Sequence, residues 1–442
     1  MRIQLSEHFT YAKLLRFTFP SIVMMIFTSI YSVVDGVFVS NFAGKTPFAA
    51  VNLIMPLLII TGAPGFMVGT GGSAIVAKTM GQGKAELANR YFSFLVCAAA
   101  VGGAAVGWLG FAFARPTAIA LGADGEMLEY CVLYARIILA ANPFFILQNV
   151  FQSFLIAAEK PKLGLCITVG AGLTNIVLDA VMVGVFRWGV AGAALATILS
   201  QAVGGLTPVV YFLRKNSSLL RLVRPRFDGR VLWKTCSNGS SELMSNISGS
   251  VVAMLYNFQL LRLAGEDGVA AYGAIMYVNF IFAAIFIGYA IGSAPVISFH
   301  YGAEHSGELH SLLGKSTVIN AAAGVVMTGA ALALAGPMSK IFVGYDQELY
   351  ELTVRGFRLY AISFLLCGLN IFGSSFFTAL NNGLASAAIS FLRTLVFQCA
   401  SVLILPIFLD VDGIWLAISV AEAAALAVTA ALLAVNRKVY RY

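Results

Sequence analysis

Residues 162–186 read KLGLCITVGAGLTNIVLDAVMVGVF, an apolar run with one internal acid, Asp179, and a basic residue at or next to each end. A helix that crosses a lipid bilayer needs about 20 mostly apolar residues, and this run has that length. Similar runs follow one another along nearly the whole chain. The predicted spans are 14–40, 47–78, 91–114, 127–157, 162–186, 189–213, 231–262, 268–299, 312–336, 346–380, 385–409 and 412–436. The sequence therefore predicts an all-α membrane protein with twelve transmembrane helices.

The composition supports this class. The 442 residues are 59% hydrophobic and only 11% charged, and the mean hydropathy is +0.87. Soluble chains carry about 25% charged residues. A soluble enzyme, a nucleic-acid-binding domain and a disordered protein are therefore excluded, and the predicted spans leave no length for a soluble catalytic domain.

The distribution of charge predicts the orientation in the membrane. The chain has 28 Lys and Arg against 20 Asp and Glu, a net charge of +8. When the N-terminus is placed in the cytoplasm, most of the basic residues fall in cytoplasmic segments, and the external loops are rich in acids. Positive loops stay on the cytoplasmic side, so we expect both termini to be cytoplasmic. The basic excess then reflects topology and requires no nucleic-acid partner.

The two halves of the chain align with each other. At an offset of 221 residues Gly71 matches Gly292 and Gly81 matches Gly302. At an offset of 222 the pattern G-x-D-x-E at residues 122–126 recurs at residues 344–348. Each half would hold six helices, so both repeats start on the same side and should be related by a pseudo-two-fold axis along the membrane normal.

This repeat predicts two six-helix lobes. The N-lobe is residues 1–213, the C-lobe is residues 231–442, and a basic cytoplasmic linker, 214–230, joins them. The linker is either a connector retained inside by its charge or a binding segment for anionic lipid. Two lobes with a cleft between them suit alternating access, in which one lobe rocks against the other.

Four acids lie deep in the predicted helices: Asp35, Asp179, Glu242 and Glu422. A carboxylate near the bilayer centre costs about 3 kcal/mol or more, so each one is a candidate functional residue. Asp35 and Asp179 have no basic residue nearby in sequence. They could carry a proton, or form a Na⁺ site together with amide and hydroxyl oxygens. The alternative is structural, a helix-break cap or a hydrogen bond within the bundle.

The acidic pair belongs to one lobe. Tyr256 stands at the position that matches Asp35, and Ala400 or Ser401 at the position that matches Asp179. We therefore expect the coupling site to lie where the repeat is broken, in the N-lobe.

Several polar residues are candidates for a substrate cavity. Glu242 near the start of the seventh span could face the cleft, or it could pair with Lys234 or Arg230. The other candidates either line the cavity or form hydrogen bonds between helices: Asn246, Gln148, Asn149 and Gln152.

Pro20 removes a backbone hydrogen bond within the first helix and should bend it. A bendable helix that carries Asp35 could link ion binding to the shape of the cavity, whereas a static kink is equally compatible with the sequence.

Other patterns do not indicate a site. Residues 69–74, GTGGSA, fit a dinucleotide pattern but lie within a membrane span with no preceding strand, so helix packing explains them. The spacing of His300, His305 and His310 puts them on different helix faces, so we expect no metal site. There is no ATP-binding P-loop, and no cofactor is expected.

A family resemblance follows from residues 175–179, NIVLD, and 188–197, WGVAGAALAT. Together with Pro20 and Asp35 in the first helix and residues 157–162, AAEKPK, they resemble the multidrug and toxic compound extrusion (MATE) family, especially its bacterial multidrug export branch. The resemblance implies an antiporter in a bacterial plasma (inner) membrane. It would expel small organic compounds, often cationic drugs or toxins, in exchange for H⁺ or Na⁺.

The resemblance also implies site residues. The ion site would use Asp35, Asn175, Asp179 and Thr197, and Glu242 matches a glutamate of the seventh helix. Some relatives carry an acid in the tenth helix, but residues 358–380 contain none, which favours coupling in the N-lobe. We expect the protein to act as a monomer surrounded by membrane lipids.

Two other functions remain open. A lipid-linked oligosaccharide flippase of the same superfamily would need a basic cavity. An intramembrane enzyme would need a catalytic set in the membrane, yet all four histidines are in or beside cytoplasmic segments and HExxH does not occur. We therefore expect a transporter and not an enzyme.

Overall fold

The computed structural model describes residues 3–43, 45–344 and 346–442, apart from the side chains of residues 32, 33, 36, 37, 40, 41 and 45. Arg2 and the side chain of Lys45, whose charges enter the topology prediction, lie outside the described part. Within it the chain is almost entirely helical and no strand occurs.

The N-lobe holds the first nine helical elements. They are α1 (Tyr11–Phe38), η1 (Val39–Ala43), α2 (Lys45–Gly81), α3 (Ala85–Ala120), α4 (Gly125–Ala140), α5 (Asn142–Ala157), α6 (Pro161–Asp179), η2 (Ala180–Val185) and α7 (Gly189–Leu213), the η elements being π-helices.

The C-lobe holds the other nine. They are α8 (Gly229–Asn238), α9 (Ser240–Gly302), α10 (Ser306–Val343), α11 (Gln347–Ala361), α12 (Phe364–Ala379), α13 (Gly383–Phe391), η3 (Leu392–Phe397), α14 (Gln398–Ile404) and α15 (Pro406–Tyr440).

These elements form the twelve predicted spans. Among the described residues, nine continuous helices are long and apolar enough to cross a membrane, and two bent pairs, α4 with α5 and α11 with α12, each make one more. The 63-residue α9 would be about 95 Å long if straight. It breaks at Gly265, where φ is 63°, a conformation that glycine adopts without strain. Gly239, just before α9, and Gly302, at its far end, both contact the same half of α2, so α9 doubles back and supplies two spans.

The bent pairs confirm the internal repeat. In each lobe the G-x-D-x-E pattern places an Asp directly before a helix, Asp124 before α4 and Asp346 before α11. Each of these helices then bends into its successor, by 58° between α4 and α5 and by 46° between α11 and α12. Equivalent sequence positions therefore produce equivalent kinks.

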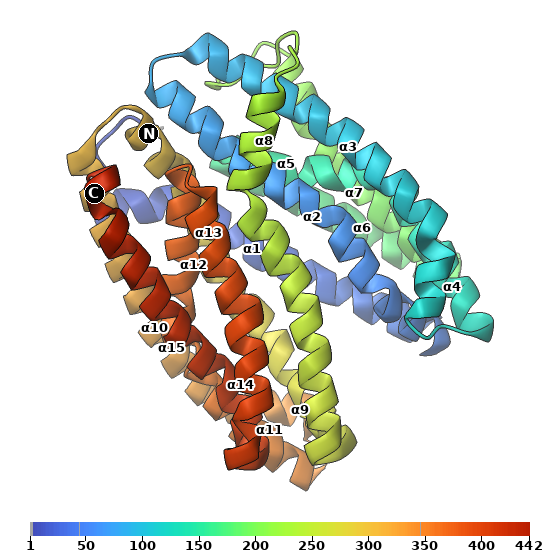
Figure 1. Ribbon diagram of the computed structural model, residues 1–442. Helices are drawn as coiled ribbons and strands as arrows, with labels where there is room; N and C mark the ends of the chain where they lie inside the picture. Colours follow the sequence, from blue (N-terminus) through green and yellow to red (C-terminus); the bar gives the residue numbers. More distant parts are fainter. Residues whose placement is uncertain (1–2, 44, 345) are drawn as a thin grey trace.

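The two lobes lie side by side, with both termini and α8 at the end where they meet (Figure 1). The contacts there follow the repeat. A Cβ on Gly81 would lie 2.0 Å from the Phe299 carbonyl oxygen, and one on Gly302 would lie 2.0 Å from that of Lys78. Each glycine of the matched pair thus lets its helix approach the other lobe, as a pseudo-two-fold axis between α2 and α9 requires.

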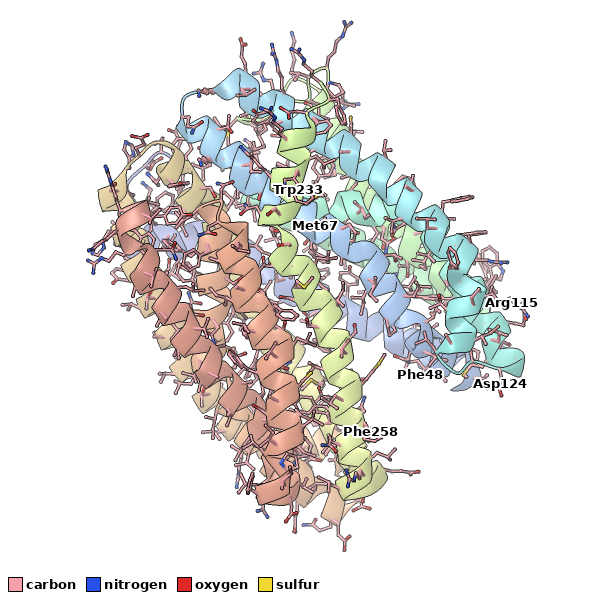
Figure 2. All side chains as sticks on the ribbon, viewed as in Figure 1. Phe48, Met67, Arg115, Asp124, Trp233 and Phe258 are labelled. Atoms are coloured by element: carbon pink, nitrogen blue, oxygen red, sulfur yellow. The ribbon has the colours of Figure 1, made fainter. Side chains whose placement is uncertain are left out.

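The lobes separate toward the opposite end (Figure 1). Met67 and Trp233 lie near the junction, whereas Phe48 of α2 and Phe258 of α9 lie on the separated ends (Figure 2). The structure is therefore closed on the side of the termini.

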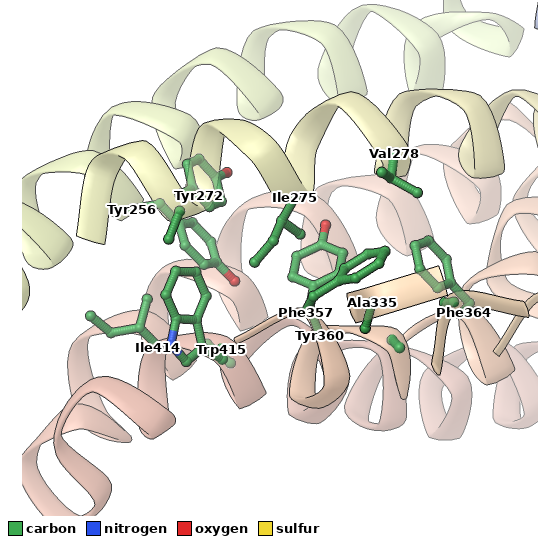
Figure 3. Packing of buried hydrophobic residues seen from close by; sticks show 14 of the residues in the cluster. Tyr256, Tyr272, Ile275, Val278, Ala335, Phe357, Tyr360, Phe364, Ile414 and Trp415 are labelled. Carbon is green, nitrogen blue, oxygen red and sulfur yellow. The ribbon is translucent and has the colours of Figure 1, made fainter. Parts of the chain in front are cut away.

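Each lobe has its own hydrophobic core. In the C-lobe, Tyr256 stacks on Tyr272 with ring centroids 5.0 Å apart, and both belong to the cluster that buries Trp415 and Phe357 (Figure 3). In the N-lobe, Phe92 meets a group of phenylalanine rings edge to face. A further cluster joins the lobes at the closed end, where Phe17 packs with Tyr289 and Phe376.

Helix α1 belongs to both lobes. Its first half packs against α9, where Gly288 and Gly292 lie against Ile22 and Thr18. Its second half packs on α6 of the N-lobe through Phe27 and Tyr31.

Candidate functional site

Two carboxyl groups meet inside the N-lobe, that of the half-buried Asp35 and that of the buried Asp179. Asp35 comes from the last third of α1, and Asp179 is the last residue of α6. Asp179 is completely buried, and the two side chains interact directly with each other. Sequence positions 144 residues apart are thus brought together by the packing of α1 on α6.

The pair lacks charge compensation. No basic side chain among the described residues interacts with either carboxyl. Neither oxygen of Asp179 accepts a hydrogen bond from a described group, and neither does Oδ1 of Asp35. Buried polar atoms are almost always hydrogen-bonded, and a buried unpaired charge is costly. Within the described part of the chain, three oxygens of the pair have no hydrogen-bond donor and neither carboxyl has a counterion.

Further polar side chains surround the pair. Asn175 lies one turn before Asp179 on α6, and its Nδ2 has no described partner. Thr197 of α7 donates to the Ala193 carbonyl at 3.0 Å, which leaves the lone pairs of its hydroxyl oxygen available. The four residues of the expected ion site thus lie on α1, α6 and α7, which pack together.

Two tyrosines complete this environment. The Tyr134 hydroxyl of α4 pairs with Thr197 and lies within electrostatic range of both aspartates. Tyr31, one turn before Asp35, pairs with Gln148 of α5. Sequence reasoning missed both tyrosines, because a single Tyr in an apolar helix carries no distinctive signal. Tyr31 could have been found from its one-turn spacing to Asp35.

Both acid-bearing helices end in π-helical turns. The π-helix η1 begins at Val39, four residues after Asp35, and η2 begins at Ala180, directly after Asp179. These two elements contact each other. π-Helical turns widen the backbone and occur often at functional sites, so this end of the N-lobe is built from irregular helices.

Pro20 lies within the stretch of α1 that packs against α9, between Thr18 and Ile22. Asp35 lies further along α1, in the half that packs on α6 through Phe27 and Tyr31. A bend there would change how the acid is presented relative to the C-lobe.

A separate cavity lies between the lobes. It has a volume of about 190 Å³ and is lined from the N-lobe by Thr70, Ser73 and Ser153, and from the C-lobe by Glu242, several serines and Arg393. Apolar residues of α9, including Ile287 and Ile291, complete its wall. The cavity is therefore amphipathic, with a carboxylate among hydroxyl groups.

Only some of the residues predicted for a substrate cavity lie at this cavity. Glu242 lines the cavity and forms no described ion pair with Lys234 or Arg230. Asn246, one turn further on, donates to the Glu242 carbonyl at 2.8 Å.

The three polar residues of α5 lie inside the N-lobe and do not line this cavity. Asn149 lies against the backbone of Gly65 and Gly69, and Gln148 lies against Gly204 of α7. Gln152 is buried, with 6% of its surface exposed.

The fourth deep acid, Glu422, has the opposite environment to the aspartates. Arg393 of η3 contacts its carboxylate through Nε at 2.9 and 3.0 Å and through Nη2 at 2.7 Å. Asn370 of α12 donates to Oε2 at 2.7 Å and is itself bonded by Thr429. Glu422 is thus fully satisfied inside the C-lobe. Its partner is 29 residues away on another helix, so the sequence could not assign it.

The described residues contain no group of three or more His, Cys, Asp or Glu that could hold a metal ion. His8 pairs with Glu308 at 2.7 Å, and His300 faces His305. Gly69 serves helix packing, since a Cβ there would lie 3.1 Å from the Asn149 carbonyl oxygen.

Comparison with known proteins identifies the family. The MatE family model matches residues 20–181 and again 243–402, one match in each lobe. The chain belongs to the MatE family. Its two matched segments coincide with the repeat described above.

Two curated relatives are named multidrug export protein MepA. That of Staphylococcus haemolyticus is 24% identical, over 67% of this chain and 65% of its own length. That of Staphylococcus saprophyticus is 23% identical over 80% of each chain. A solved structure titled as the outward-facing conformation of a multidrug resistance MATE family transporter matches with a TM-score of 0.93 and 21% identity, over 99% of this chain and 98% of the other. This MatE protein therefore has the MATE transporter fold.

Proposed function

We propose that this MatE protein is a multidrug efflux antiporter that expels small organic cations in exchange for H⁺ or Na⁺. The single observation that carries the proposal is the Asp35 and Asp179 pair, which has no described counterion and in which three of the four carboxyl oxygens lack a described hydrogen-bond donor. Its membrane fold and the names of its MepA relatives agree with this function.

The pair suits an exchangeable ion. Two neighbouring carboxylates in a medium of low polarity repel each other strongly, so one proton or one cation is strongly favoured. Na⁺ would find oxygen ligands in the two carboxylates, the Asn175 amide and the Thr197 hydroxyl. A permanent lysine or arginine would occupy the site and prevent exchange.

Helix α1 offers a link between the ion and the lobes. Because α1 packs on both lobes, a change of charge at Asp35 would act on the contact with α9 as well as on α6. An ion can bias two conformations only if it binds them with different affinity. We infer that neutralisation of the pair alters the bend near Pro20 and so changes the relative stability of the two lobe arrangements.

Glu242 provides a site for an organic cation. It lies in the cavity between the lobes, and the only described basic residue there, Arg393, is already paired with Glu422. This lining does not have the excess positive charge that a lipid-linked oligosaccharide flippase would need. It favours a cationic cargo with apolar surface.

We further propose that the protein works as a monomer in a bacterial plasma (inner) membrane, with both termini cytoplasmic. The arrangement described above, closed at the termini, would then be the outward-facing state. Alternating access follows if the contacts of α2 with α8 and of α1 and α2 with α9 open while the opposite ends of the lobes close.

The decisive experiment is efflux of a fluorescent organic cation from proteoliposomes, with pH and Na⁺ gradients imposed separately. We expect one gradient to drive efflux by the wild type, and Asp179→Asn to abolish it, because Asn cannot exchange a proton and binds cations weakly. Asp124→Asn, an exposed acid at a helix start, is the matched control and should retain efflux. Normal ion-driven efflux by a folded Asp179→Asn protein would reject the proposal.

A further inference from the structure

The cavity between the lobes has a second charged group besides Glu242. Arg393 lies on η3 and lines the same cavity, with 17% of its side chain exposed. Because Glu422 is buried behind it, the guanidinium is held in place at the cavity wall. A lone surface arginine would lose far more side-chain entropy on binding a ligand.

The geometry of the ion pair leaves part of the guanidinium available. Guanidinium has five N–H donors in a planar fork. Nε and Nη2 are directed to Glu422, whereas Nη1 donates to no described group. Arginine binds carboxylates and similar acceptors well because several parallel donors share one plane. The remaining edge can therefore bind an acceptor while Glu422 stays paired.

Hydroxyl groups surround this position. Ser390, one turn before Arg393, bonds to Ser374 at 2.9 Å, and Ser374 bonds to Ser386 at 2.9 Å. Ser374 and Ser390 both line the cavity. Hydroxyls can reorient to donate to a ligand oxygen, so the C-lobe wall provides several donors near one cation.

We propose that Arg393 forms an acceptor subsite, and that the cavity takes zwitterionic organic molecules with the cationic group at Glu242 and a carboxylate at Arg393. The apolar residues of α9 would contact the ring system between the two groups. This inference rests on the proposed export of organic cations and narrows the substrate class. It assigns Arg393 a binding role in addition to its ion pair.

Dye binding tests the proposal with a matched pair of ligands. Rhodamine B carries a delocalised cation and a carboxylate, and its ethyl ester keeps the cation and the rings but lacks the carboxylate. Equilibrium binding of each dye to purified protein is measured by fluorescence anisotropy. We expect the wild type to prefer the acid over the ester, and the ratio of the two Kd values to fall about tenfold in Arg393→Gln/Glu422→Gln, as for the loss of a charge-assisted hydrogen bond.

The double variant avoids an unpaired buried charge, because both members of the ion pair become neutral and similar in size. Arg355→Gln/Asp412→Asn is the matched control, since this ion pair is more exposed and does not line the cavity. Its dye ratio should equal that of the wild type. Arg393→Lys keeps the charge but not the planar fork, and should give an intermediate ratio.

The outcomes separate this inference from the proposed function. An unchanged ratio in the Arg393→Gln/Glu422→Gln protein, or wild-type binding of the ester without the acid, overturns the acceptor subsite. Binding that depends on Arg393, combined with a failure of loaded vesicles to export either dye under any ion gradient, supports the subsite and contradicts the antiporter. Export of the ester alone by the wild type supports the antiporter and contradicts the subsite.

Discussion

The two lobes treat their buried acids in opposite ways. In the N-lobe, Asp35 and Asp179 lie against each other without a basic partner, and three of their oxygens accept no described hydrogen bond. In the C-lobe, Glu422 receives hydrogen bonds from Arg393 and Asn370. Asp179 and Glu422 are equally inaccessible, since each is 0% exposed, whereas Asp35 is half-buried.

The difference shows that burial alone does not identify a functional acid. A carboxylate with a complete set of partners contributes to the structure of its lobe, whereas one without partners retains the ability to bind something else. The same repeat thus produces one lobe with a fully paired deep acid, Glu422, and one lobe whose deep acids lack described counterions. We expect the two kinds of site to respond differently to loss of charge.

The largest expected effect on stability is in the C-lobe. Arg393→Leu leaves the Glu422 carboxylate buried without its counterion, which should cost about 3–5 kcal/mol. Arg393→Leu/Glu422→Leu removes both charges and should recover most of that loss. The test is the unfolding temperature of each purified protein in detergent. We expect it to be highest for the wild type, slightly lower for the double variant and lowest for the single variant.

A double variant no more stable than the single variant would contradict this view of the pair. It would mean that Arg393 stabilises the lobe by contacts other than its bonds to Glu422.

In the N-lobe we expect neutralisation of an acid to leave the stability unchanged or to raise it slightly. Asp179→Asn keeps the volume of the side chain, removes the repulsion with Asp35 and adds N–H donors beside an unpaired oxygen. Its free energy of unfolding should therefore be the same as that of the wild type or higher by up to about 1 kcal/mol, the size of one hydrogen bond. Glu422→Gln is the matched comparison and should be clearly less stable, because Arg393 loses its counterion. Similar losses for both variants would remove the distinction between the lobes.

Much of the fold follows from local sequence signals. Apolar length predicts the spans, and the matched glycines predict the internal repeat. The structure adds that Gly81 and Gly302 also form a close contact between the lobes. The break at Gly265 was placed correctly as a loop between spans. The bend between α4 and α5 was not predicted, although Pro143 at the start of α5 is a local signal for a helix break.

Less of the candidate site than of the fold could be predicted from the sequence. Asp35, Asn175 and Asp179 stand out because polar groups are expensive in lipid. The pairing of Glu422 with Arg393 depends on the packing of α15 against η3, and no spacing along the chain reveals it. For the same reason Tyr134 could not be distinguished from the other aromatic residues, although it lies within range of both aspartates.

Tyr134 offers the finest test of the comparison. Tyr134→Phe removes one hydroxyl and leaves the buried ring, so the lobe should remain folded. Since this hydroxyl pairs with Thr197 and polarises the surroundings of both aspartates, we expect a few-fold weaker apparent affinity for the coupling ion, the size expected for one hydrogen bond. The concentration of H⁺ or Na⁺ that gives half-maximal efflux measures it. Tyr130→Phe, one turn earlier on α4, is the control, because its hydroxyl bonds to Glu126 outside the site at 2.9 Å. If both variants have the wild-type affinity, the Tyr134 hydroxyl does not contribute to ion binding. The ion site would then consist of the carboxyl pair with Asn175 of α6 and Thr197 of α7.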